Sequence, residues 1–173
     1  MDGLGQIWVS YFDEGLFGNY GWRTPIGRSG LCCFTNSGQR IWEYESPSGF
    51  DGICDCYALN VSRDGVWAYY YSEVPIVRVG PDWNVQGWHT QRPGCRALAI
   101  RDNHALLYGE YGERRTTCQL LELTASDTKP IAEIALDLHS ETDLSNAIVI
   151  GRDMELHVFA GDDWYRFSLE SLN

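Results

Sequence analysis

The residues with the greatest potential for chemistry lie in the segment 13–29. Two adjacent carboxylates, three aromatic rings, an amide and a guanidinium group alternate there with glycines. Aromatic rings stack on flat ligands, while the charged and amide groups bind polar atoms of a ligand. The candidate residues for a ligand-binding or interface loop are Asp13, Glu14, Phe17, Asn19, Tyr20, Trp22 and Arg23. The alternative interpretation is a loop whose rings pack inward, over an open sheet edge or in a dimer contact.

Carboxylates elsewhere in the chain give a weaker indication of acid–base catalysis. Glu43 and Glu45 alternate along a predicted strand and share one of its faces. Two carboxyl groups about 5 to 9 Å apart can hydrolyse a glycoside. Asn60, Asp64 and Asp102 fall near predicted turns, where Asp commonly bonds its own backbone. The sequence therefore predicts no catalytic residue.

The cysteines and histidines lack the spacing of metal ligands. The four histidines show no His-x-x-x-His pattern, and no two cysteines are spaced as Cys-x-x-Cys. Cys54 and Cys56 share one face of a predicted strand, and core packing is a simpler interpretation of this pair than a soft metal site. There is also no Gly-x-Ser-x-Gly elbow and no phosphate-binding Gly-x-x-x-x-Gly-Lys motif. The sequence predicts no metal and no cofactor.

The elements that must position these residues are short strands. Runs of β-branched and aromatic residues recur between Gly, Asp, Asn and Ser, and they predict about 14 strands and no long helix. The pattern of small, apolar and aromatic residues in 58–69 returns in 97–108, and a third copy lies in 147–159. A repeat of about 40 residues with four strands per copy is typical of β-propeller blades.

These repeats predict an all-β fold of four-stranded antiparallel blades in a single β-propeller-like domain, 1–173. The blades cover approximately residues 6–45, 54–89, 95–135 and 146–169. The first copy lacks its first strand and the last copy lacks its fourth, so about 3.5 blades form an incomplete ring. Because open sheet edges pair with other strands, we expect a homodimer joined through the open ends. A compact arrangement within one chain is the alternative.

Charge and hydropathy restrict the partners of the chain. A net charge of −11 and a pI near 4.6 disfavour binding to nucleic acid or to an anionic membrane, because both attract basic proteins. The sequence has no apolar run of about 18 residues and no signal-peptide pattern at its N-terminus. Several of the six cysteines lie in apolar runs, so we expect reduced thiols and a cytoplasmic location.

The N-terminal part of the chain carries a resemblance to other proteins. Its segments WVSYFDEG (8–15), FGNYGW (17–22) and PIG (25–27) resemble segments of uncharacterised bacterial propeller-like proteins, and the likeness extends over most of the chain. The resemblance implies that this chain corresponds to the C-terminal half of those proteins, and it implies no activity. The markers of WD40 and kelch repeats are absent, since Asp82-Trp83 and Asp163-Trp164 stand at turns and no Gly-Gly pair occurs.

An aromatic insertion without a catalytic constellation favours a non-enzymatic binding or protein-interaction module. The expected partner is a small polar ligand or a protein, besides a second copy of the chain. A propeller-type hydrolase or lyase acting on a sugar or lactone is the alternative function. A fragment that keeps the fold without an activity is a third interpretation, because the chain begins and ends within a blade.

Overall fold

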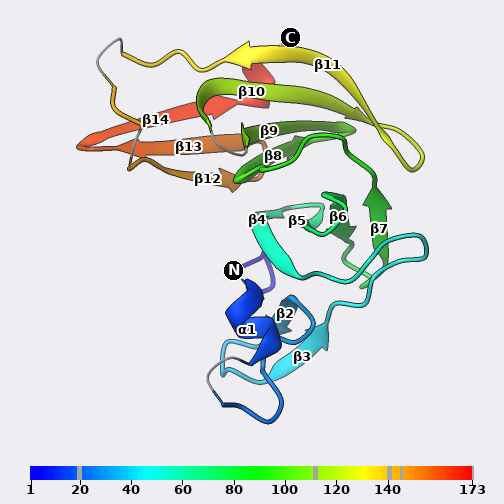
Figure 1. The fold of residues 1–173 in the computed structure, drawn as a ribbon. Helices are drawn as coiled ribbons and strands as arrows, with labels where there is room; N and C mark the ends of the chain where they lie inside the picture. The colour runs from blue at the N-terminus through cyan, green and yellow to red at the C-terminus, as the bar shows by residue number, and fades with distance from the viewer. Residues whose placement is uncertain (19–20, 111–112, 140–141, 145, 173) are drawn as a thin grey trace.

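The chain forms four antiparallel sheets that follow one another along the sequence (Figure 1). The computed structural model describes all residues except 19, 20, 111, 112, 140, 141, 145 and 173. In Figure 1 the two C-terminal sheets lie at the top, the second sheet lies below them, and the first sheet lies at the bottom. None of the described sheets closes into a barrel. The expected all-β fold of an incomplete propeller is confirmed, and each sheet is called a blade below.

The first two blades comprise seven strands. The first blade has the order β1 (Ile7–Ser10), β2 (Leu31–Phe34) and β3 (Arg40–Glu43). The second blade has the order β4 (Asp55–Ser62), β5 (Gly65–Tyr71), β6 (Ile76–Val79) and β7 (Val85–Trp88). In the described chain the first blade thus has three strands, as the incomplete first repeat predicted.

Of the other two blades, the third has four strands and the last has three among the described residues. The third blade has the order β8 (Ala97–Arg101), β9 (His104–Glu110), β10 (Glu113–Leu123) and β11 (Thr128–Ala135). The last blade has the order β12 (Ile148–Arg152), β13 (Glu155–Ala160) and β14 (Asp163–Ser168), followed by the 3-10 helix η1 (Leu169–Ser171). The last blade is therefore also three-stranded among the described residues.

The connection between β1 and β2 contains a short helix that the strand pattern did not predict. Helix α1 (Asp13–Phe17) ends at Gly18, which adopts the left-handed conformation with φ 72°. This conformation is accessible to glycine without a side-chain clash, so Gly18 stops the helix after five residues. No helix in the described part of the chain has the length and apolarity that crossing a bilayer requires.

A separate hydrophobic core fills each junction between successive blades. In β5, Trp67 and Tyr69 pack toward the third blade, while Val66 and Tyr70 pack toward the first. Because successive side chains of a strand point to opposite faces, a middle blade has two buried faces. In the third blade, Leu98 and its neighbours pack in the core shared with the second blade. Other side chains of the third blade pack in the core shared with the last blade. The large aromatic residues of β5 thus lie between blades.

The innermost strands β4, β8 and β12 meet at the centre of the row, where Asn60 joins three blades. The Asn60 amide nitrogen donates to the carbonyl oxygens of Leu98 and Asp153, both at 2.8 Å, and its oxygen accepts from the Asp153 amide at 2.7 Å. Gly151 of β12 lies against β8 so closely that a Cβ atom there would overlap the Leu98 carbonyl. Small residues and one buried amide therefore hold the last blade to the others.

Candidate functional site

The insertion 13–29 lies over the outer face of the first blade, which is the face that points away from the second blade. Leu16 of α1 is buried, and Gly27 lies so close to the ring of Tyr11 that a side chain would overlap it. The Cys32 thiol of β2 lies 3.7 Å from the carbonyl oxygen of Ile26 and 3.2 Å from the hydroxyl of Ser29. The insertion therefore packs on its own blade and covers it.

The predicted binding residues within this insertion lie in two groups. Asp13 and Glu14 form the first turn of α1, where the hydrogen bond that the protonated Glu14 carboxyl donates to the neighbouring Asp13 carboxylate raises the pKa of Glu14. Phe17 is 64% exposed at the end of the helix, and Trp22 and Arg23 are exposed further along the loop. Asn19 and Tyr20 lie outside the described residues. The described members of this set belong neither to the apolar sheet face nor to the cleft presented below.

Among the carboxylates considered for acid–base chemistry, Glu43 is held in ion pairs. Glu43 lies 2.8 Å from Arg40 and 3.4 Å from Arg28, so two guanidinium groups hold it. These three residues line a shallow depression along β3 together with Glu45. Asn60 uses its amide to bind backbone groups, as described above. In the part of the chain that is described, no group of three or more His, Cys, Asp or Glu side chains is arranged to hold a metal ion.

All six cysteines are unpaired thiols, and most lie in the cores between strands. Burial raises the pKa of Cys56, Cys95 and Cys118 to about 12. A thiol with such a pKa stays protonated at neutral pH and is a poor nucleophile. These three cysteines therefore act as small core residues.

The outer face of the last blade is apolar and uncovered. It consists of Ile148 and Ile150 on β12, Phe159 on β13 and Trp164 on β14, and the strand register places these side chains on the same side of the sheet. Ile148 and Trp164 are each 62% exposed. The opposite side of the same sheet packs on the third blade through Leu156 and Val158, which are buried. Sequence analysis missed this face, although the uninterrupted apolar run in β12 was a signal that both faces are apolar.

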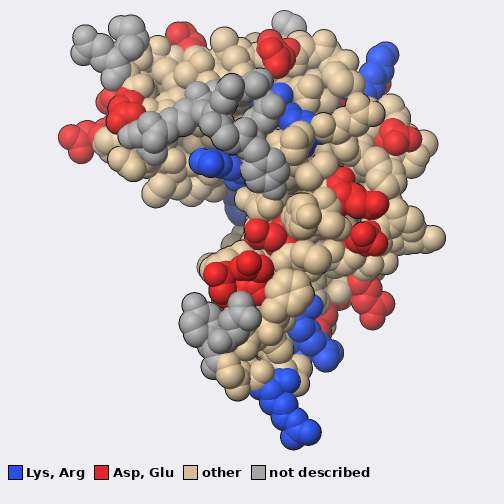
Figure 2. Space-filling view, viewed as in Figure 1, with Lys and Arg blue, Asp and Glu red and all other residues tan. Residues whose placement is uncertain are grey.

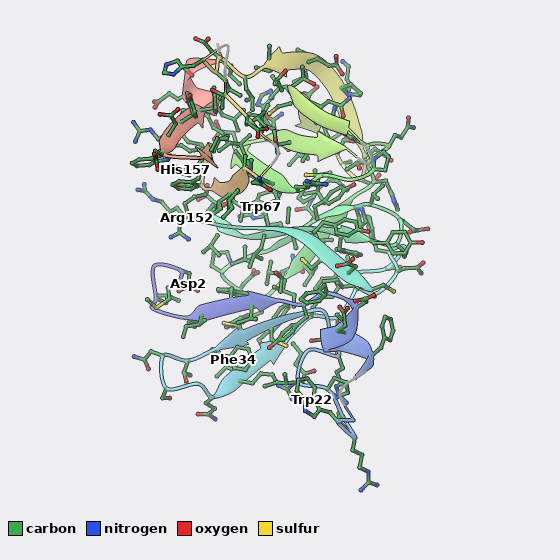
Figure 3. All side chains as sticks on the ribbon, turned by 60° about the vertical axis from the view of Figure 1, so that its left-hand side comes forward. Asp2, Trp22, Phe34, Trp67, Arg152 and His157 are labelled. Carbon is green, nitrogen blue, oxygen red and sulfur yellow. The ribbon has the colours of Figure 1, made fainter. Side chains whose placement is uncertain are left out.

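Polar side chains border this apolar face. The Trp164 indole stacks on His157 with ring centroids 5.8 Å apart, and its nitrogen donates to His157 Nδ1 at 3.3 Å. Glu155 lies 3.5 Å from Arg166 and 3.6 Å from His157. Figure 3 shows His157 and Arg152 at the same margin of the molecule. An apolar centre bordered by polar groups of both signs is the usual anatomy of a protein interface.

A second feature is a cleft of about 440 Å³ between the first and second blades. It is lined by the N-terminal turn, by Trp8 and by the turns that follow β4 and β6, where Trp83 lies. We call it the tryptophan cleft. Figure 3 shows Asp2, which lines the cleft, on the opposite side of the molecule from Trp22 of the insertion. Sequence analysis noted Asp82-Trp83 as a turn but assigned it no role.

Comparison with known proteins places the chain in a family. The YxzG family model matches residues 28–165, which include all of the last three blades except the end of β14. The chain belongs to the YxzG family. A search of proteins with curated functions found no match. Membership in the YxzG family brings no ligand or partner with it, so the function is argued from the surface features above.

Proposed function

We propose that this member of the YxzG family is a non-enzymatic protein-interaction module whose docking surface is the outer face of its last blade. The observation that carries the proposal is the exposure of Ile148, Ile150, Phe159 and Trp164 on one side of a single sheet. An apolar patch of this kind marks an interaction site more often than a free surface. The residues of this face argue for binding, since the exposed side chains at its centre are apolar.

The occupant that we propose for this face is the same face of a second copy. Within the chain, blades associate by packing one apolar sheet face on another, as Leu156 of the last blade does in the core that it shares with Leu106 and Cys118 of the third blade. The last blade has such a face without a following blade among the described residues. Stacking two last blades about a two-fold axis buries the same surface on both copies, which is the commonest symmetry of a homodimer.

Local charge supports association between copies of an acidic chain. The chain carries a net charge of −11, and Figure 2 shows carboxylates gathered around a hollow between the upper blades and the first blade. The outer face of the last blade carries charges of both signs, because the strand register places Arg152, Glu155 and Arg166 on that side of the sheet. Repulsion between exposed charges farther apart than about 8 Å is largely screened at physiological salt. The face is thus one on which two acidic copies can meet.

The reduced thiols support a cytoplasmic location as part of this proposal. Every cysteine is unpaired, and those in the cores between strands are protected by burial. Disulfides are rare in the cytoplasm, where thiols are kept reduced.

The test is the molar mass of the purified chain and of two matched variants by size-exclusion chromatography with light scattering. At micromolar concentration the wild type is expected at twice the chain mass of 19.6 kDa. Trp164→Asp places a charge in the proposed interface and is expected to give the monomer mass. Phe17→Asp changes an equally exposed ring at the insertion and is expected to remain a dimer.

Three results would overturn the proposed occupant. A monomeric wild type would exclude self-association and leave the face for a different protein. Dissociation by Phe17→Asp alone would move the interface to the insertion. A dimer that persists with Trp164→Asp, in a protein with wild-type circular dichroism, would exclude this face.

A further inference from the structure

The tryptophan cleft is built on a cluster of three indole rings in mutual contact. Trp83 and Trp42 are stacked with centroids 5.8 Å apart and planes 24° apart, and Trp8 lies 5.4 Å from Trp42 and 5.7 Å from Trp83. Trp8 and Trp83 line the cleft, while Trp42 supports them from the first blade. Rings that are fixed before a ligand arrives lose little conformational freedom on binding.

The backbone of Trp83 is strained, as it also is at Val74, Asp102 and Asp153. The φ of Trp83 is 66°, in the left-handed region that glycine and asparagine adopt most readily. The strain is held by a tight turn, in which the Trp83 amide donates to the Gly80 carbonyl at 3.0 Å and the Gly80 amide donates to the Asn84 carbonyl at 2.9 Å. Strain of this kind persists mainly at sites where the side chain has a function.

Asp2 fixes the N-terminal wall of the cleft. Its carboxylate accepts from the amides of Leu4 and Gln6 at 2.9 and 3.0 Å, and from the Trp8 indole nitrogen at 2.8 Å. Partial burial alone would raise the pKa of Asp2, but these hydrogen bonds outweigh it and lower the pKa. Asp2 is thus an ionised group that holds both the turn and the indole of Trp8.

The other polar groups of the cleft come from the turn after β4 and from the N-terminal turn. Arg63 is exposed at the cleft, and Gln6 and Ser62 add an amide and a hydroxyl. The lining thus contains one carboxylate and one guanidinium, whose charges cancel. It favours a neutral ligand that has many hydroxyl groups and one flat apolar face. The volume of about 440 Å³ lies in the range of small-molecule sites.

We infer that the tryptophan cleft binds a neutral saccharide, with one sugar ring packed on Trp83 and its hydroxyl groups bonded to Arg63 and Gln6. The C–H groups of a pyranose face pack on an indole ring, and its hydroxyls match donors and acceptors around the rim. The outer face of the last blade contributes no residue to the lining of the cleft, and Arg152 at its margin reaches the N-terminal turn by a hydrogen bond to the Met1 carbonyl at 3.1 Å.

The test is saturation-transfer NMR followed by calorimetric titration of the full chain. The probes are maltose, cellobiose and N,N′-diacetylchitobiose, with indole-3-acetate as a flat anionic comparison. At least one disaccharide is expected to bind with a millimolar or lower Kd, and indole-3-acetate is expected to bind more weakly. Trp83→Asn is the main variant, because asparagine suits the positive φ and keeps the turn intact. It is expected to weaken binding about tenfold or more without loss of the fold.

Trp164→Asn serves as the matched control, since it removes an exposed indole on the last blade and is expected to leave saccharide affinity unchanged. Arg63→Met is expected to weaken binding as well. The inference is overturned if no disaccharide binds at tens of millimolar, or if indole-3-acetate binds and the disaccharides do not. Equal affinity of the wild type and Trp83→Asn would also overturn it.

Discussion

The first and last blades are both three-stranded, but their outer faces differ. The outer face of the first blade is covered by the insertion 13–29, with Leu16 buried and Arg28 and Arg40 bound to Glu43. The outer face of the last blade exposes Ile148 and Trp164, each at 62%. One end of the row of blades is thus closed by its own chain, and the other end presents an apolar sheet.

The connections between strands account for this difference. The chain between β1 and β2 is long enough to form α1 and to return across the sheet. The connection between β12 and β13 consists of Asp153 and Met154 alone, with Asp153 at φ 53°. A tight turn pairs two strands but supplies no residues to cover a face. The connection between β1 and β2 can therefore cover part of the first blade, whereas the turn between β12 and β13 leaves the outer face of the last blade exposed.

The largest expected effect comes from separating the last blade from its neighbours. Gly151→Ala would place a Cβ on the Leu98 carbonyl, and neither backbone can move without disrupting a core. The free energy of unfolding is expected to fall by more than about 3 kcal/mol in urea denaturation. The control Gly161→Ala, in the open turn after β13 with φ 60°, is expected to cost about 1 kcal/mol. Equal effects would show that the last blade is not held by this close approach.

Asn60→Ala tests whether the last blade depends on the second blade as well as the third. The substitution leaves the buried Leu98 carbonyl and the Asp153 amide without their partners, so a loss of about 2 to 4 kcal/mol is expected. Hydrogen exchange measured by mass spectrometry is expected to rise most in β12 and β13 and least in the insertion. Asn36→Ala, an exposed turn residue, is the control. A uniform rise in hydrogen exchange over all four blades would contradict the specific role of Asn60 in holding the last blade.

A matched pair of truncations compares the two outer faces directly. Leu16→Ala removes the buried side chain that holds the insertion, and a loss of about 2 to 3 kcal/mol is expected. Ile150→Ala removes a side chain that is 48% exposed, and the stability of the monomer is expected to change by less than about 1 kcal/mol. The measurement is thermal unfolding of both variants at low concentration. A larger loss for Ile150→Ala would show that the last face is already covered within the monomer.

The smallest effect concerns Asp2, near the margin where the two ends approach each other. The carbonyl oxygen of Met1 accepts a hydrogen bond from Arg152 at 3.1 Å (Figure 3). Because the folded state lowers the pKa of Asp2 below its ordinary value of 3.8, its contribution to stability is present above that pH. The contribution is lost as the pH falls through the folded-state pKa. The stability advantage of the wild type over Asp2→Asn is therefore expected to shrink below about pH 4, measured by urea unfolding. A constant difference from pH 7 to pH 2 would contradict this role for Asp2.

The strand pattern was sufficient for most of the fold. The blades were predicted from alternating apolar and aromatic residues and from the repeat between 58–69 and 97–108. This was possible because the alternation that marks a strand is present in the strand's own sequence. Helix α1 was missed, since five residues are too few to show a helical period. The candidate insertion was found from its composition, but its packing over β2 depends on contacts between Ile26 and Cys32 that no local pattern contains.

The sequence by itself determined the all-β class, the meander order within each blade and the three-stranded first and last blades, because neighbouring strands and tight turns are local features. The tertiary structure alone decided which apolar faces are buried. It covered the first blade, left the last one exposed, and joined Trp8, Trp42 and Trp83 in one cleft. The physical reason is that burial depends on what lies across a sheet face, and residues distant in the sequence supply that contact.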